Sequence, residues 1–376
     1  MIPAPPVGSA PKLALTAVVC CLAAPGVPGQ QEGARGAVQV SPGLIKKSIL
    51  RGIEGTVGCF ELKTSVDMAA VGVPGVKLEL AGTSRSQLLL DGEALLSLID
   101  QDGMESISVL GARNDSGKLF NLTLDGARTA ITYAEGDVTG EGALVLADPF
   151  KTFRSATMYV ENGGTLTKVF VGPGWEQLSE TRAVRTDEDP GDVVGALLAR
   201  EFSPDQVNKR TEDADPGRNY APEHAWLGAL VGDFSVDGGG ASGRFHRARL
   251  VGNGRYLLCV GGADSGALAP GAAEGDAPGA DPKLSARVDQ VTVIGFDSAR
   301  RVYQLFQISG ADGPVHYCEG APRDDGGLVL RDLVGGLKVT VSPLNGGAQR
   351  WEWTAGRNTP VEVLLRPAPA ADGDGQ

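Results

Sequence analysis

Short apolar runs separated by turn-forming residues recur along most of the chain. Residues 291–320 contain three such runs, VTVIGF, VYQLFQI and VHYCEG, with breaks at residues 297–301 and 309–314. β-Branched and aromatic residues between turn residues are typical of an antiparallel meander. Residues 120–124 alternate strictly between apolar and polar side chains, as a strand with one buried face does. The pattern therefore predicts an all-β protein.

The same pattern occurs twice. Residues 107–136 match residues 291–320, and the equivalent tyrosines, Tyr133 and Tyr317, are 317 − 133 = 184 positions apart. The offset changes only where one copy carries extra turn-rich sequence, above all the Gly/Ala/Pro-rich residues 261–282. Since loops tolerate insertions and strands do not, we expect a duplicated β-domain.

Each copy is predicted to form a sequential series of short strands. The strands expected in the first copy are 59–66, 76–80, 87–98, 107–110, 118–124, 129–134, 143–147, 156–161 and 166–171. Those expected in the second copy are one near residue 234, then 243–250, 256–261, 288–296, 302–308, 315–319, 327–332, 337–342, 349–354 and 360–365. Short helices are expected within 42–57, 192–201 and 222–231. Closing each meander into an up-and-down barrel removes exposed edges, and the interior then is filled or holds one small ligand.

The remaining segments set the domain boundaries. Lys12 and the apolar run 13–24 are typical of a secretory leader ending at residue 29, which predicts export to the periplasm or the extracellular space. Lipoprotein anchoring through Cys20 or Cys21 is disfavoured because Val19 is not small. The expected divisions are 1–29 signal peptide, 30–41 flexible start, 42–175 first barrel, 176–221 acidic linker, 222–367 second barrel and 368–376 disordered tail. Outside the leader, no stretch is long enough to be transmembrane.

Charge and cysteine content limit the binding partners and sites that the chain is expected to have. The formal net charge is −12, which argues against nucleic acid. Removal of the leader leaves Cys59, Cys259 and Cys318, which lack the spacing of a zinc site or a redox pair. We expect them to be buried as small apolar side chains. The sequence does not decide whether two of them form a single disulfide.

No complete catalytic motif is present, so no catalytic residue, metal site or cofactor is predicted. His316 has two functional interpretations, an axial haem ligand or a general base, but a hydrogen-bonded residue of the sheet is favoured. His224 is expected to act locally at a helix start. His246 stands among arginines that could hold an anion, although a solvated face is favoured. Glu135 and Glu319 precede equivalent glycines and are expected to stabilise turns.

Several short pieces of the second copy point to a family. They are PEHAWLGALVGDF (222–234), GNGRYLL (252–258), VIGFDSARRVYQLF (293–306), HYCEG (316–320) and GGLVL (326–330). In their order and spacing they resemble the bacterial domain-of-unknown-function family numbered fifteen seventy-nine, which is grouped with the lipocalin-like barrels, or calycins. The first copy resembles a diverged relative. This resemblance implies a fold and no reaction.

The leading hypothesis is an exported, non-enzymatic protein whose barrels bind a small apolar or amphipathic ligand, or serve as an envelope interaction module. The residues expected to line a ligand site are Tyr133, Tyr159, Phe306, Tyr317 and Trp353. An ordinary packed core is the other interpretation of these residues. Two alternatives stay open for the function: an enzyme with a site at the barrel mouth around His316 or His246, and a purely structural scaffold. The sequence does not indicate the oligomeric state.

Overall fold

The structure is a computed structural model of the full chain. It describes residues 57–90, 92–113, 116–125, 131–139, 143–148, 153–160, 164–199, 223–238, 244–263, 288–310, 315–332, 336–355 and 358–368. The predicted signal peptide and flexible start lie outside these residues, as do nearly all of the first helix, of the Gly/Ala/Pro-rich insertion and of the tail.

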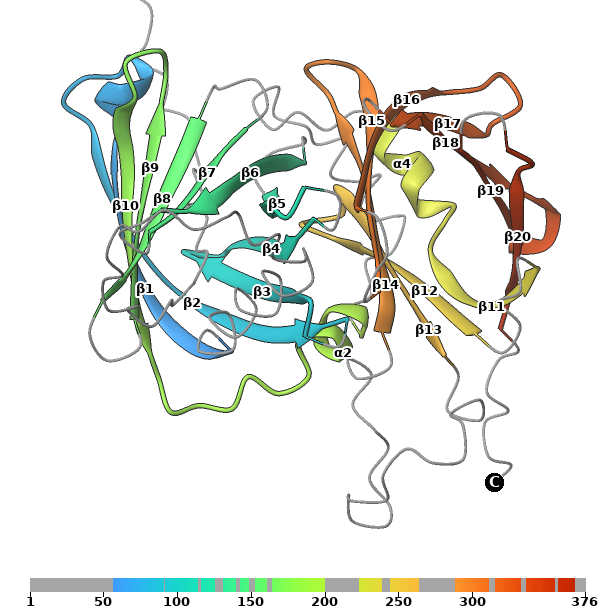
Figure 1. Cartoon of the computed structure of the whole chain (residues 1–376), viewed down its shortest axis with the longest axis horizontal. Coiled ribbons are helices and arrows are strands. Elements are labelled where there is room, and N and C mark those ends of the chain that lie inside the picture. The colour runs from blue at the N-terminus through green and yellow to red at the C-terminus, as the bar shows by residue number, and fades with distance from the viewer. Residues whose placement is uncertain are drawn as a thin grey trace, which may run out of the picture.

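Two closed antiparallel barrels of ten strands each form the described part of the chain (Figure 1). In both barrels every strand pairs with its neighbours in sequence, and the first strand pairs with the last. This confirms the prediction of two tandem up-and-down barrels.

The first barrel runs from β1 to β10. Its strands are β1 Gly58–Asp67, β2 Lys77–Leu89, β3 Ala94–Gln101, β4 Met104–Ala112, β5 Leu119–Asp125, β6 Thr132–Val138, β7 Leu144–Ala147, β8 Phe153–Val160, β9 Gly164–Val171 and β10 Glu176–Arg185. A short 3-10 helix, η1 (Met68–Val71), connects β1 to β2, and the helix α2 (Val193–Leu198) follows β10.

The second barrel runs from β11 to β20 and is preceded by the helix α4 (Glu223–Gly228). Its strands are β11 Gly232–Gly238, β12 Arg244–Val251, β13 Tyr256–Ala263, β14 Val288–Asp297, β15 Val302–Ser309, β16 Val315–Pro322, β17 Leu328–Asp332, β18 Leu337–Pro343, β19 Gln349–Ala355 and β20 Val361–Pro367. A short 3-10 helix, η5 (Asn345–Gly347), lies between β18 and β19.

Two details of the first barrel differ from the sequence expectation. Residues 87–98 do not form one strand, because the chain turns between β2 and β3 with Leu90 and Gly92 at φ values of 57° and 87°. The segment 176–185, expected as the start of the acidic linker, is β10, which closes the barrel by pairing with β1 and β9. Its buried residues are mainly small or polar, such as Thr181 and Ala183, so it lacks the apolar alternation of a typical strand.

Equivalent glycines explain part of the repeat. A Cβ at Gly136 would lie 1.8 Å from the carbonyl oxygen of Val145, and one at Gly320 would lie 1.8 Å from that of Val329. Both glycines therefore permit a close approach between two strands that no other residue allows.

The two interiors have different chemistry. Apolar side chains fill most of the second barrel, including Phe296, Leu305 and Trp351. The first barrel buries many hydroxyl and amide side chains, which bond one another across strands. These bonds include Thr64–Thr181 at 2.9 Å, Ser86–Ser97 at 2.8 Å and Thr157–Thr167 at 3.0 Å. The interior of the second barrel is thus the more apolar environment for a ligand.

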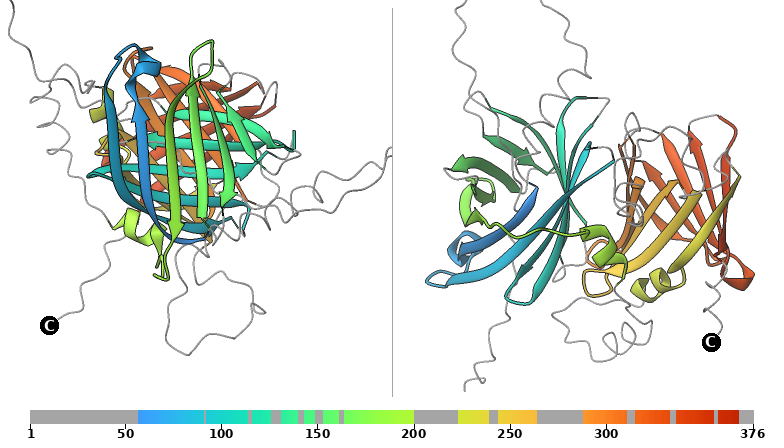
Figure 2. Two further views of the ribbon diagram at one scale, coloured as in Figure 1. Left: turned by 90° about the vertical axis from the view of Figure 1, so that its left-hand side faces the viewer. Right: turned by 90° about the horizontal axis from the view of Figure 1, so that it is seen from below.

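The barrels stand side by side (Figure 2) and share one hydrophobic core between their outer faces. This core joins β2–β6 of the first barrel to β12–β16 of the second, and α2 contributes Val193, Val194, Leu197 and Leu198. The rings of Tyr133 and Tyr317 stack at its edge, with centroids 5.7 Å apart and planes 6° apart. The equivalent strands β6 and β16 therefore meet through equivalent tyrosines.

Cys59, Cys259 and Cys318 are buried and unpaired, so the single disulfide left open by the sequence is not formed. Burial raises the pKa of the Cys259 thiol, and it raises that of Cys318 to about 12. Among the described residues, no helix has the length and apolar character needed to cross a bilayer.

Candidate functional site

The second barrel has one end closed by a helix. Leu227 and Leu230, at and just after α4, are fully buried in the barrel core. Three hydrogen bonds attach this segment to the barrel: Tyr303 Oη donates to the Glu223 carbonyl at 2.8 Å, Trp226 Nε1 to Gly326 O at 2.9 Å, and Gln349 Nε2 to Leu230 O at 2.9 Å. The opposite end, where β15 ends and β16 begins, is the mouth.

A pocket of about 310 Å³ opens at this mouth. Its lining comes from six strands and comprises Gln290, Gln307, Ser309, His316, Leu337, Trp353 and Val363. The volume lies at the lower end of the range for small-molecule sites. We call these seven residues the mouth pocket.

His316 is the titratable residue of the lining. Its Nδ1 lies 3.3 Å from Oδ2 of Asp332, and the exposed fractions of the two side chains are 21% and 11%. Strand alternation explains the placement: Cys318 and Leu330 belong to the barrel core, so His316 and Asp332, two residues away on the same strands, also face inward. A carboxylate at Nδ1 fixes the ring orientation and leaves Nε2 for another group.

Trp353 forms the aromatic part of the pocket. Its indole nitrogen donates to Oε1 of Gln307 at 3.2 Å, and Nε2 of Gln307 donates to the hydroxyl of Ser309 at 3.5 Å. Behind it, Trp351 stacks at a centroid distance of 5.7 Å and is buried. The pocket thus has a rigid aromatic surface next to amide and hydroxyl groups.

His246 lies deeper in the same barrel. Its ring is 6.0 Å from that of Phe234 and 5.7 Å from that of Trp351, and burial lowers its pKa to about 4. Its Nε2 has no hydrogen-bond partner within the described part of the chain. The expected solvated face is therefore wrong for His246, because strand alternation turns it inward while Arg247 faces the other side.

His224 belongs to the closed end. It is fully buried on α4, and its ring meets Phe296 edge to face at 5.6 Å. A local structural role near the helix start, as expected from the sequence, agrees with this position.

The residues expected to line a ligand site separate into two places. Trp353 lies in the mouth pocket, whereas Tyr133, Phe306 and Tyr317 lie on outer barrel faces in the shared core. Their apolar side chains are buried by the other barrel and not by a barrel interior, so their expected place inside a barrel is wrong. The side chain of Tyr159 lies outside the described residues.

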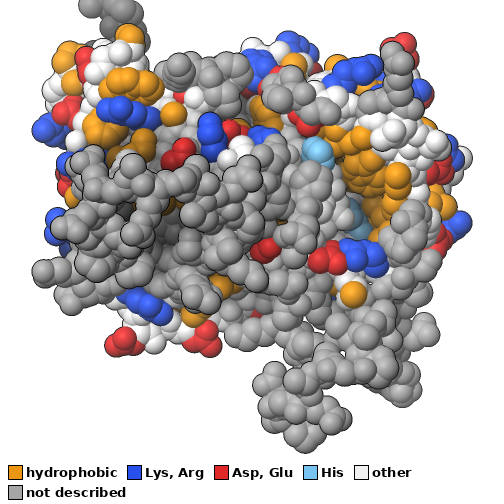
Figure 3. All heavy atoms as spheres, viewed as in Figure 1, with side chains coloured by type: hydrophobic (Ala, Val, Ile, Leu, Met, Phe, Trp, Pro, Cys, Tyr) orange, Lys and Arg blue, Asp and Glu red, His pale blue; other side chains and the backbone are white. Residues whose placement is uncertain are grey.

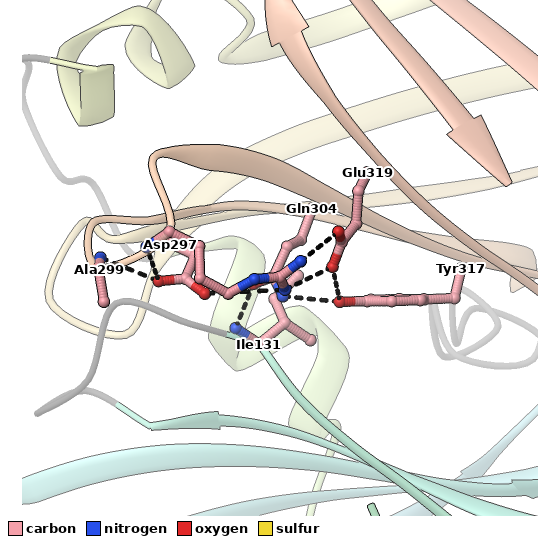
Figure 4. Close-up of polar contacts among 7 residues, drawn as sticks. Ile131, Asp297, Ala299, Gln304, Tyr317 and Glu319 are labelled. Atoms are coloured by element: carbon pink, nitrogen blue, oxygen red, sulfur yellow. Dashed lines mark hydrogen bonds and ion pairs between the residues drawn. The ribbon is translucent and has the colours of Figure 1, made fainter. Parts of the chain in front are cut away.

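A polar network borders this shared core (Figure 4). The backbone nitrogen of Ile131 donates to Oε1 of Gln304 at 2.8 Å across the interface, and Nε2 of Gln304 donates to the Tyr317 hydroxyl at 2.7 Å. That hydroxyl donates to Glu319 at 2.7 Å, and Arg300 forms two hydrogen bonds with the same carboxylate. The network connects the two barrels and a turn of the second barrel.

The first barrel carries a matching arrangement. The Tyr133 hydroxyl donates to Glu135, and Nη1 of Arg113 lies 2.6 Å from the same carboxylate. Burial and Glu135 raise the pKa of Tyr133. At Glu319, burial would raise the carboxyl pKa, but hydrogen bonds from Arg300 and Tyr317 hold it below its usual value. The two glutamates thus connect a turn arginine to an interface tyrosine, a role wider than the expected turn stabilisation.

The sequence did not predict that Asp332 lies beside His316. Period-2 alternation puts His316 and Tyr317 on opposite faces of their strand, but it does not tell which face points inward. The inward position of Cys318, a small apolar residue between polar ones, is a weak signal that could have decided this. Asp332 could not be found in this way, because its pairing requires the register of β16 and β17.

Comparisons with known proteins give only distant structural similarities. No family model matches the chain, and no curated protein matches it. The chain is similar to a protein of unknown function of the DUF3598 family from Nostoc punctiforme, with a TM-score of 0.20 and 10% identity over 83% of this chain and 95% of that one. It is also similar to a mutant of transferrin-binding protein B from Haemophilus parasuis, with a TM-score of 0.16 and 5% identity over 82% of this chain and 75% of that one.

These similarities are too distant to carry a functional argument. The first structure belongs to a family of unknown function other than the one that the second copy resembles. What the fold defines is a protein of two tandem, ten-stranded antiparallel barrels.

Proposed function

We propose that the second barrel binds a small amphipathic molecule in its mouth pocket. The observation that carries the proposal is a cavity of about 310 Å³ in which Trp353 lies beside the His316–Asp332 pair at the open end of a barrel. Few, well-placed polar groups in a largely apolar concavity are typical of ligand sites.

The lining suggests how such a ligand would be oriented. Its apolar part would contact the indole of Trp353 together with Leu337 and Val363. Its polar end would face His316, whose Nε2 is directed by the bond at Nδ1, and the amides of Gln290 and Gln307. An amphipathic ligand satisfies both sides of the pocket, whereas a purely apolar one would leave these amides without new partners.

In this proposal the first barrel serves as a scaffold. Its buried hydroxyl groups bond one another, and its outer face packs against the strands β12–β16, of which β14–β16 carry part of the mouth pocket. The extensive shared core supports this role. Export to the periplasm or the extracellular space remains our expectation from the leader sequence.

Anilinonaphthalene sulfonate, which joins an aromatic body to one anionic group, is a suitable probe. We expect saturable binding of one molecule to the full chain by isothermal titration calorimetry. Trp353→Leu should weaken it about tenfold or more, since a large aromatic contact is removed. His316→Gln should weaken it about tenfold, because a directed polar contact is lost.

Trp226→Phe is the matched control, because Trp226 lies on α4 at the closed end of the same barrel. It should bind the probe like the unmodified chain. Equal affinity of all four proteins, or more than one weak site per chain, would contradict a site at the mouth. Haem tested in the same way would show whether His316 can serve as an axial ligand.

A second candidate is an enzyme in which His316 acts as a general base. The carboxylate at Nδ1 favours it, because an acid that orients an imidazole is a recurring feature of general bases. His246 is a weaker choice, since it is enclosed by Phe234 and Trp351. Hydrolysis of p-nitrophenyl acetate above background, lost in His316→Gln and reduced in Asp332→Asn, would support this activity. Equal rates in all three proteins would exclude it for this substrate class.

A further inference from the structure

We propose that the first barrel attaches to the surface of a zwitterionic lipid membrane through the connection between β1 and β2. We call residues 68–76 (MAAVGVPGV) the valine tip. The proposal rests on a different barrel and different residues from the mouth pocket, so each can fail without the other.

The valine tip has a defined conformation. The Asp67 side chain accepts from the backbone nitrogen of Ala69 at 3.0 Å and caps η1, and Gly72 ends the helix in the left-handed region at φ 83°. The backbone nitrogen of Met68 donates to Val76 O at 3.0 Å, and that of Val73 to Met68 O at 3.0 Å. These bonds close the tip into a compact loop.

This loop exposes apolar side chains instead of burying them. Val71, Val73 and Val76 are 46%, 42% and 40% exposed. Within the described residues, only two other large hydrophobic side chains are as exposed, Val184 and Val361. Three of these five exposed side chains thus occur in one loop of nine residues that carries no charge, and such clustering marks an interaction site.

An aromatic residue and a cation stand at the base of the tip. Met68 packs with Leu178 of β10, beside the turn between β9 and β10 that carries Trp175. The guanidinium of Arg154 lies 4.9 Å from the ring centre of Trp175 and 5.0 Å from that of Phe170. In Figure 3, hydrophobic side chains gather at this end of the first barrel next to Lys and Arg side chains.

The shape and chemistry fit a lipid surface better than a protein partner. The tip is a projecting end of the barrel (Figure 1) and has nine residues, whereas a stable protein interface takes about 20–30 residues per side. Tryptophan and arginine side chains are common in the interfacial layer of a membrane, because each has an apolar part that contacts lipid and a polar end that contacts water.

The charges next to the tip decide the lipid class. Lys77 is paired with Asp67 at 3.7 Å, and Glu176 follows Trp175 directly, so both signs of charge are present. With a net charge of −12, the chain has no attraction to anionic lipid. Insertion of the valines should therefore drive attachment, and salt should change it little.

Flotation of the full chain with phosphatidylcholine vesicles tests the proposal. We expect binding that is unchanged between 50 mM and 500 mM salt. Val71→Ser/Val73→Ser should reduce it about tenfold or more, since two apolar side chains lose their transfer to lipid. The control Val184→Ser/Val361→Ser changes two valines that are more exposed, at 50% and 51%, and should bind like the unmodified chain.

Brominated phosphatidylcholine provides an independent readout. It should quench part of the tryptophan fluorescence, and Trp175→Phe should abolish that quenching. Failure of the unmodified chain to bind vesicles, equal loss in both double variants, or quenching that persists in Trp175→Phe would each overturn the proposal. Self-association that depends on Val71 and Val73 without any vesicle binding would overturn it in favour of a second copy as the partner.

Discussion

Phe306→Ala should lower the stability of the second barrel, because Phe306 belongs to the core between the two barrels and not to a barrel interior. Phe306 is completely buried, and its ring lies 5.3 Å from Phe120 and 5.4 Å from Tyr133 of the other barrel. Truncation of a buried phenylalanine costs about 3–5 kcal/mol. With a urea dependence of about 3 kcal/mol/M, the midpoint of unfolding of the second barrel should fall by about 1–1.7 M.

Equilibrium unfolding in urea, followed by far-ultraviolet circular dichroism, measures this shift. Phe170→Ala is the control, because Phe170 is only half buried under Arg154 on an outer face away from the second barrel. It should lower the midpoint by a smaller amount. If Phe306→Ala lowers the midpoint no more than Phe170→Ala does, the close packing of the two barrels is refuted.

Three further predictions concern individual buried groups. Gly320→Ala should destabilise the second barrel by about 2 kcal/mol or more, because its Cβ would meet the Val329 carbonyl oxygen, whereas Gly174→Ala, with no atom within 4 Å, should be neutral in thermal melting. Burial lowers the pKa of His246 from 6.5 to about 4, so His246 is neutral in the folded protein. Its contribution to the free energy of unfolding is complete above pH 6.5 and is lost as the pH falls through 4, a loss of about 3 kcal/mol. In His246→Phe this pH-dependent loss should be absent from the free energy of unfolding measured between pH 3 and 7. Cys259 and Cys318 should stay unmodified by iodoacetamide at pH 8 in the native chain and react after unfolding in urea, as read by mass spectrometry, since burial raises both thiol pKa values.

Much of the fold could be predicted from the sequence, because strand alternation and turn residues are local signals. The repeat of Tyr133 at Tyr317 and of Gly136 at Gly320 indicated a duplicated barrel, which the structure has. Strand β10 was not predicted, because its inward side chains are small or polar. Its place in the barrel depends on pairing with β1, more than 100 residues away, which no local pattern reports.

The candidate site could be predicted only in part. Alternation assigns residues to two faces of a strand but does not tell which face points into the barrel when both are buried. On β15 and β16 the outer face carries Phe306 and Tyr317, because it packs against the other barrel, and the inner face carries the rings of Tyr303 and His316. Among the four expected residues whose side chains are described, only Trp353 therefore lies in the mouth pocket. The pairing of His316 with Asp332 depends on the register of β16 and β17.

The position of a bound ligand tests the central claim most directly. Crystals of the full chain grown with a brominated naphthalene sulfonate would locate the bromine by anomalous diffraction. The account predicts one bromine in the mouth pocket, in contact with Trp353 and with the sulfonate towards His316. A bromine between Tyr133 and Tyr317, inside the first barrel, or at no ordered position would contradict it.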